Sequence, residues 1–155
     1  MKKLYIAIGV IGIAGVIYFT GLYTYFIRTE IQEVLPTPVA SGMTQKTLAL
    51  GTFGEIDFIH KGSGEAKIVD IGGKRILRLE NFNVVSGPDL YVYISKSTQP
   101  TKDIKSLDDF VDLGQLKGTT GNQNYDIPST ASSDHKTAII WCKRYGVLFT
   151  FAVMN

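Results

Sequence analysis

The chain begins with a long apolar run that carries no charge, and this run constrains the fold more than any other feature. The run extends over 24 residues, from Leu4 to Ile27. Apart from Thr20 and Thr24, its residues are apolar, aromatic or Gly. As a helix the run would be about 36 Å long, whereas the hydrocarbon core of a bilayer is about 30 Å thick. Residues 1–28 are therefore predicted to form a cytoplasmic tip and one N-terminal transmembrane helix, which anchors the protein in the membrane.

The charges that flank this run predict its orientation. Lys2 and Lys3 precede it. On its far side, Arg28 has the acidic residues Glu30 and Glu33 nearby. Because Lys and Arg are enriched on the cytoplasmic side, we expect a single-pass protein of the cell membrane with a cytoplasmic N-terminus and an extracytoplasmic C-terminal domain.

A cleaved secretory signal is the competing interpretation, since it also begins with basic residues. Its apolar region is usually about 7–15 residues long and ends at small residues, whereas this run is longer and ends in aromatic residues. The longer run favours an anchor over a signal. Both interpretations export the rest of the chain.

The rest of the chain divides into a linker and one domain. Residues 29–46 include Pro36 and Pro38, which disfavour helix, and they are predicted to form an extracytoplasmic linker. Residues 47–155 hold 12 Lys/Arg and 12 Asp/Glu, so this domain is formally neutral. A neutral domain lacks the overall basic charge that attracts nucleic acid, and nucleic acid is not expected as a partner.

Polar and apolar side chains alternate along residues 47–155, between turns rich in Gly, as is typical of β-strands. We predict strands over residues 53–60, 65–71, 75–82, 90–95, 111–116, 137–143 and 147–154, and one helical turn near 107–110. Asn81 is expected to point inward with Leu77 and Leu79. The predicted fold class is all-β, an antiparallel β-sandwich of about seven to nine short strands, preceded by the transmembrane helix.

Most enzyme and metal motifs are missing from the sequence. It contains no G-x-S-x-G, no phosphate-binding Gly loop with Lys-Ser/Thr and no H-E-x-x-H, so nothing in it indicates a turnover enzyme. One Cys and two His cannot form a four-thiolate site. No C-x-x-C-H is present for c-type haem, and no His follows Cys142 as a copper loop would require.

Two polar segments are expected to be solvated surface instead of ligand sites. The acidic residues of the first lack the regular spacing of a calcium loop; they are Asp103, Asp108, Asp109 and Asp112. His135 lies in the polar run of residues 132–136 and is expected at the surface. No metal site is therefore predicted.

Cys142 is the residue whose chemistry the sequence leaves most open. Alternation along the strand predicted over 137–143 puts Cys142 on one face with Ile140, and Arg144 follows on that face if the strand continues. A cationic neighbour lowers the pKa of a thiol, so Arg144 is a candidate for stabilising the thiolate. The simpler alternative is that Cys142 is a small buried side chain without chemistry.

A cofactor at Cys142 is a further alternative. A b-type haem could be held by the Cys142 thiolate with His60 as a second ligand, because haem iron takes thiolate and imidazole ligands. His60 shares a predicted strand face with Ile56 and Phe58, which equally suits a histidine at the edge of the core. The cofactor is therefore unknown at this stage, with haem and no cofactor equally compatible with the residues.

Several short motifs follow one another along residues 48–154. They are Asn81-Phe82, Gly87–Tyr93, Leu113–Gly118, Gly121–Tyr125, Ile140–Lys143 and Val147–Phe149. Together they resemble the DM-thirteen ("electron transfer") domain family. The resemblance implies a β-sandwich over residues 47–155 with a signature cysteine, here Cys142. In that family the cysteine is proposed to be redox-active, either as a bare thiol or through a prosthetic group such as haem.

Two functional hypotheses follow. The first is a membrane-anchored extracytoplasmic domain with a redox or electron-transfer role centred on Cys142, which would act on a redox partner protein. The second is a non-catalytic binding or adhesion module in which Cys142 is structural and an exposed face with Tyr91 and Tyr93 contacts a partner. Solvent access to Cys142 separates the two.

Overall fold

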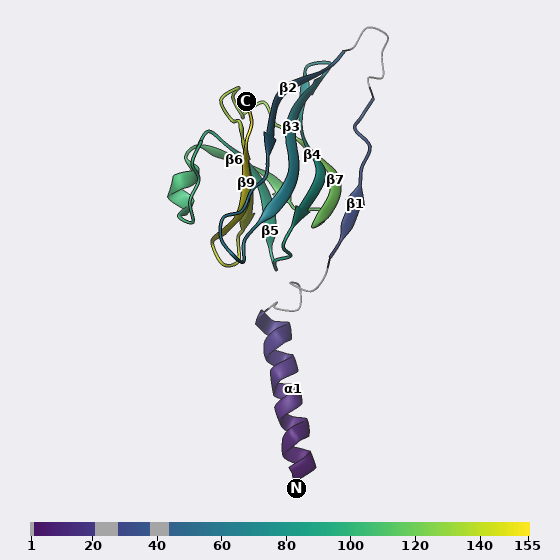
Figure 1. Ribbon diagram of the computed structural model, residues 1–155, viewed down its shortest axis with the longest axis vertical. Helices are drawn as coiled ribbons and strands as arrows, with labels where there is room; N and C mark the ends of the chain where they lie inside the picture. The colour runs from purple at the N-terminus through teal and green to yellow at the C-terminus, as the bar shows by residue number, and fades with distance from the viewer. Residues whose placement is uncertain (1, 21–27, 38–43) are drawn as a thin grey trace.

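The computed structural model describes residues 2–20, 28–37 and 44–155. Helix α1, Lys2–Thr20, lies apart from the strands (Figure 1). Within the described residues, no helix combines the length and the apolar character needed to cross a membrane. The predicted span continues to Ile27, and residues 21–27 lie outside the described residues, so the transmembrane helix stays a prediction.

Nine strands of the described residues form two facing sheets (Figure 1). The first has the order β1-β7-β4-β3-β2 and the second β6-β5-β8-β9. Every pair of neighbours is antiparallel except β1 and β7, which run parallel. The predicted all-β sandwich is confirmed. The strands are β1 Glu30–Gln32, β2 Gln45–Thr52, β3 Gly62–Ile71, β4 Lys74–Val84, β5 Leu90–Ser95, β6 Phe110–Gln115, β7 Thr120–Asp126, β8 Thr137–Cys142 and β9 Val147–Val153.

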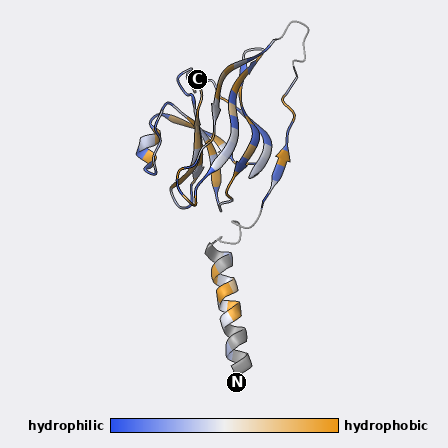
Figure 2. Cartoon of the chain, in the orientation of Figure 1, coloured by the Kyte–Doolittle hydropathy of each residue, from blue (hydrophilic) through white to orange (hydrophobic). Residues whose placement is uncertain are grey.

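An apolar core fills the space between the sheets, because alternate residues of each strand point into it. Burying one such side chain contributes about 1.5–3 kcal/mol. Figure 2 shows the corresponding bands of hydrophobic and hydrophilic residues along the strands. Fully buried members of this core include Leu77 and Leu79 of β4, Val92 and Ile94 of β5, and Ile140 of β8.

Strand β8 is also covered on its outer face. Ile139 and Trp141 point away from the main core into a second apolar cluster, in which Leu107 is completely buried. Leu107 ends the short 3-10 helix η2, Ile104–Leu107, within the segment that joins β5 to β6. All six residues of β8 are therefore buried.

The prediction of a strand over residues 53–60 is wrong, because the strand in this region, β2, ends at Thr52. Residues 55–60 instead form a tight loop in which the N–H groups of Ile56 and Asp57 donate to the carbonyl of His60 at 2.9 and 3.1 Å. The Asp57 carboxylate accepts from the N–H groups of Ile59 and His60 at 2.8 and 2.7 Å. An aspartate that satisfies nearby backbone groups competes with strand pairing, and this explains the error.

Strand β7 is missing from the sequence-based prediction, because its residues Thr120–Asp126 are mostly polar. Its alternate residues Gly121, Gln123 and Tyr125 are nevertheless buried. Gln123 exchanges two hydrogen bonds with the backbone of Gly118, at 3.2 and 2.7 Å. A buried amide that is fully hydrogen-bonded is tolerated in a strand, so polarity concealed the pattern.

Asn81 does not point inward, contrary to the expectation. The pairing of β4 with β7 shifts register between Leu79 and Phe82, and Asn81 is exposed with a φ of 47°. Its backbone N–H donates to the Asn122 side chain at 2.9 Å. The extra residue of this bulge changes the face that Asn81 occupies.

The predicted linker contains a strand that docks on the sandwich. Residues Glu30, Ile31 and Gln32 pair with Thr120, Gly121 and Asn122. The backbone N–H of Glu33 extends the pairing, donating to the carbonyl of Asn122 at 2.9 Å. We call residues 29–34 the strap.

We expect Gly121→Ala to displace the strap. Gly121 has a φ of 100°, and a Cβ there would overlap the carbonyl oxygen of Ile31. Gly73→Ala is the matched control, because Gly73 has a φ of 87° and nothing within 4 Å of a Cβ. Urea unfolding should show a loss of about 1–2 kcal/mol for Gly73→Ala from backbone strain alone. The loss should be about 1–3 kcal/mol larger for Gly121→Ala, with faster amide exchange in the strap. Equal losses and unchanged exchange would contradict the docking.

Candidate functional site

Cys142 is the last residue of β8 and points into the main core. It pairs with Leu90 of β5 and Val147 of β9 and has no exposed surface. Among the cavities that the structure describes, none has Cys142 in its lining. The alternation predicted for this strand is confirmed, and the thiol is closed off from solvent.

Burial raises the pKa of the Cys142 thiol above its ordinary value, because a thiolate is poorly solvated in the core. Backbone hydrogen bonds from Tyr145, Arg144 and Asp89 oppose this shift, and the negative charge of Asp89 adds to it. The sulfur therefore sits among several backbone donors, yet the net effect keeps it protonated at neutral pH.

Arg144 does not lie on the strand face of Cys142. Strand β8 ends at Cys142, and residues 143–146 form an exposed turn that leads into β9. Arg144 lowers the pKa of Cys142 through its backbone N–H, and its guanidinium is not among the causes of the shift. The guanidinium of Arg144 was expected to lower the pKa of Cys142, which would have required strand β8 to continue to residue 144.

His60 lies in the loop after β2 and interacts with two other residues. Its Nδ1 is 2.9 Å from the Asp57 carboxylate, and its ring meets the ring of Phe149 edge-on, with 4.8 Å between centroids. Hydrogen bonds from Lys102 and then from His60 hold the pKa of Asp57 far below its usual range. In the described part of the chain, no hydrogen bond or ring contact joins His60 to Cys142.

These positions do not fit a haem at Cys142. The sulfur lies in a filled apolar core, whereas a macrocycle needs a cavity beside its ligand. The described residues also include no group of three or more potential metal ligands. No step of the chemistry is therefore assigned to a haem.

Tyr93 is buried and Tyr91 is partly buried, whereas an exposed tyrosine face was expected. Tyr93 is 2% exposed and stacks on Phe110 with 4.8 Å between ring centroids, and burial raises the pKa of Tyr93 to about 12. The Nζ of Lys143 lies 3.5 Å from the centroid of the Tyr91 ring and 2.6 Å from the Asp112 carboxylate. Phe110, the first residue of β6, supplies a cover that the alternation of β5 could not indicate.

His135 is buried, although a surface position was expected. Its Nδ1 accepts from the backbone N–H of Ser132 at 3.1 Å. Its buried Nε2 has no hydrogen bond and lies 3.7 Å from Asp109. Asp109 is itself ion-paired with Lys96 at 2.7 Å.

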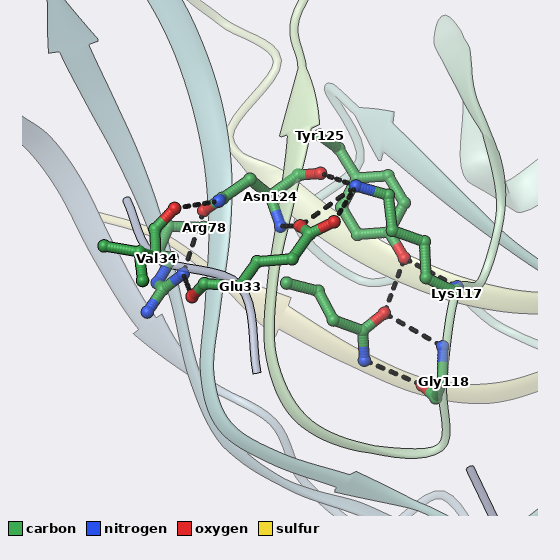
Figure 3. A network of polar contacts seen from close by, with 8 residues as sticks. Glu33, Val34, Arg78, Lys117, Gly118, Asn124 and Tyr125 are labelled. Atoms are coloured by element: carbon green, nitrogen blue, oxygen red, sulfur yellow. Dashed lines mark hydrogen bonds and ion pairs between the residues drawn. The ribbon is translucent and has the colours of Figure 1, made fainter. Parts of the chain in front are cut away.

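A polar network at the strap was not predicted at all (Figure 3). The Glu33 carboxylate accepts from Lys117 Nζ at 2.8 and 3.0 Å and from the N–H of Asn124 at 2.7 Å. Arg78 donates to the Glu33 carbonyl at 2.7 Å and to Asn124 Oδ1 at 3.0 Å. Asn124 Nδ2 donates to the Val34 carbonyl at 2.9 Å. In the sequence, this network is indicated by the polar run Asn122-Gln123-Asn124 within β7, whose side chains can hydrogen-bond to backbone groups.

Partial burial tends to raise the pKa of Glu33, but the hydrogen bonds from Lys117 and Asn124 and the charges of Lys117 and Arg78 outweigh it. The pKa of Glu33 is therefore lowered in the folded state. A lowered folded-state pKa stabilises the fold above the unfolded pKa of about 4.3, and this stability is lost as pH falls through the folded pKa.

Glu33→Gln should therefore remove part of the acid sensitivity of the fold. Between pH 7 and pH 3, the wild-type free energy of unfolding should fall by about 0.5–1 kcal/mol more than that of Glu33→Gln, a modest effect because the pair is partly solvated. Glu30→Gln is the matched control in the same strap, where the carboxylate accepts from Gln32 at 2.8 Å. Parallel pH curves for the wild type and Glu33→Gln would contradict the network.

Comparison with known proteins bears on the sandwich as a whole. The family model described as electron transfer DM13 matches residues 52–154. This range contains strands β3 to β9 completely. No curated protein and no solved structure matches the chain. The match covers more than half of the chain and confirms the resemblance. The chain therefore belongs to the electron transfer DM13 family, whose description supports a redox role in general terms.

Proposed function

We propose that this protein is a membrane-anchored extracytoplasmic redox domain in which Cys142 is the exchanging group. The family supports the redox part. The uncharged run from Leu4 to Ile27, preceded by Lys2 and Lys3, supports the anchor and the outward orientation of the sandwich. Because the Cys142 sulfur is completely buried, its reaction requires a local opening of the fold.

The position of Cys142 at the end of its strand supplies an answer. The next four residues, 143–146, are all exposed and form the turn between β8 and β9. Segments with exposed backbone open locally at lower free energy than the core does. Opening this turn would uncover the sulfur without separating the two sheets, and this is the observation on which the proposal rests.

The backbone donors around the sulfur support the same interpretation. N–H groups of Tyr145, Arg144 and Asp89 each favour the thiolate, and two of the three belong to the turn or border it. A purely apolar packing role requires no such donors, whereas a thiolate is stabilised by them. The closed form holds a protonated thiol that resists oxidation, and the open form relieves the desolvation.

The reaction that suits a single cysteine is thiol–disulfide exchange with a partner protein. In the open form the thiol loses its proton to water, and the thiolate attacks a disulfide of the partner. One S–S bond breaks as a mixed disulfide forms, and the departing partner thiolate takes the electron pair. A small thiol such as glutathione then displaces the partner, whose second thiol is released, and a second molecule of it displaces Cys142, so the two small thiols leave as one disulfide and two electrons have passed to the partner.

The burial of Cys142 favours a second candidate function, a binding module with a structural cysteine. In that case the thiol is small apolar filling, and partner contacts lie elsewhere on the surface. The covered position of Tyr93 removes the tyrosine face that the sequence had indicated for this function.

Alkylation of the full chain separates the two functions. Gly146 has a φ of 61° and open space around a Cβ, so Gly146→Ala should strain the turn by about 1–2 kcal/mol. Gly73→Ala adds comparable strain in the first sheet. If the turn controls access, native-state alkylation of Cys142 should be roughly fivefold faster or more in Gly146→Ala and nearly unchanged in Gly73→Ala.

Equal rates in both variants, or labelling confined to urea-unfolded protein, would favour the structural cysteine. The redox step is tested by mass spectrometry after incubation with oxidised glutathione. The wild type should gain one glutathione, Gly146→Ala should gain it faster, and Cys142→Ala should gain none. A wild type that alkylates natively but forms no mixed disulfide would refute the exchange reaction.

A further inference from the structure

The first sheet has one end at which the chain arrives from the N-terminal helix. Glu30 of β1 pairs with Thr120, the first residue of β7, and Asn83 near the end of β4 pairs with the same residue. Gly62 at the start of β3 pairs with Val84 at the end of β4. The start of the strap, the start of β3 and the ends of β2 and β4 therefore lie together at this end, as Figure 1 shows.

The second sheet brings Cys142 to the same end. Strand β9 runs alongside the edge of β2, since Asn155 exchanges backbone hydrogen bonds with Leu50 at 3.0 and 3.1 Å. Thr150 then reaches the carbonyl of Gly54 at 2.7 Å, past the end of β2. The start of β9 and its partner Cys142 lie further in that direction, beside the loop that follows β2 (Figure 1).

Arg28 marks where the predicted span joins this end. It lines a cavity of about 230 Å³ together with Glu55, Lys61 and Val84. The predicted span ends at Ile27, one residue earlier. A membrane surface at the end of the span would therefore meet the sandwich at this cavity.

The strap favours that orientation, because in the described residues it docks on the sandwich directly after Arg28. Strand β1 begins two residues after Arg28 and is paired with β7 over its whole length. After β1, the Glu33 carboxylate accepts hydrogen bonds from Lys117 and from the backbone N–H of Asn124 (Figure 3). A flexible linker would let the domain swing, whereas a docked strand fixes it close to its anchor.

The same end presents apolar side chains to solvent. Phe58 is 88% exposed and Ile59 is 58% exposed in the loop after β2. The Nζ of Lys61 lies 5.8 Å from the centroid of the Phe58 ring, and Tyr145, in the turn after Cys142, is 47% exposed. Aromatic rings with basic neighbours are favoured at the headgroup layer of a bilayer.

We infer that the Cys142 end of the sandwich rests on the lipid surface, with Phe58 and Ile59 inserted among the headgroups. The inference depends on the proposed membrane anchor and adds the direction that the domain faces. The turn that covers Cys142 then opens at the level of the headgroups. A redox partner would reach the sulfur along the membrane surface.

The test uses the full chain reconstituted in phosphatidylcholine vesicles, with or without bromine near the top of the acyl chains, since bromine quenches nearby Trp. Phe58→Trp reports the loop. Val34→Trp is the matched control, because Val34 is 83% exposed but lies past β1 towards the other end of β7. Wild-type Trp141 contributes the same background to both. Brominated lipid should quench Phe58→Trp and leave Val34→Trp at the wild-type level.

Flotation of the same vesicles in a density gradient tests the anchor separately. Protein that floats and shows no extra quenching of Phe58→Trp would overturn the orientation while the anchor stands, and would leave the loop for a protein partner. Protein that fails to float would overturn the anchor and the orientation together. Equal quenching of the two variants would show a domain without a fixed face toward the lipid.

Discussion

The rest of the structure depends on the double burial of strand β8. Its inner face supplies Ile140 and Cys142 to the core between the sheets, and its outer face supplies Trp141 to the cluster closed by Leu107. A strand covered on both faces is highly apolar and opens only with difficulty. The same burial desolvates the sulfur and raises its pKa. Cys142 therefore contributes to the packing of the core, and its proposed reactivity depends on opening of the neighbouring turn.

A second constraint joins the N-terminal segment to the sandwich. A parallel pair as short as β1 and β7 adds little by itself, but the ion pair of Glu33 with Lys117 and the hydrogen bonds of Asn124 surround it. These contacts hold part of the predicted linker as an ordered edge strand. Arg28, the start of the strap and the loop that carries Phe58 lie at one end of the sandwich. The proposed redox site and its proposed approach to the membrane follow from that shared position.

Much of the fold could be predicted from alternation, because β-strands with one buried face repeat every two residues. This holds for β3, β4, β5, β8 and β9, and it put Cys142 on the correct face. The same rule failed where side chains hydrogen-bond to backbone. Asp57 hydrogen-bonds to backbone N–H groups in a segment that looked like a strand but forms a loop. Gln123 is a polar residue whose buried side chain bonds to backbone, so strand β7 looked like a loop. The prediction that Arg144 shares the face of Cys142 was wrong for another reason. Strand β8 ends at Cys142, so the alternation of the strand does not extend to Arg144.

The sequence alone determined the uncharged N-terminal run, the class of fold, the family and the single thiol, because each depends on composition or on local order along the chain. Only the tertiary structure decided that His60 and Cys142 have separate partners, that Tyr93 is covered, and that the strap docks on β7. These outcomes depend on contacts between segments far apart in the sequence, such as Glu33 with Lys117 and Thr150 with Gly54. The free energy of such contacts arises from desolvation and geometry in the folded chain, and no local pattern of residues encodes them.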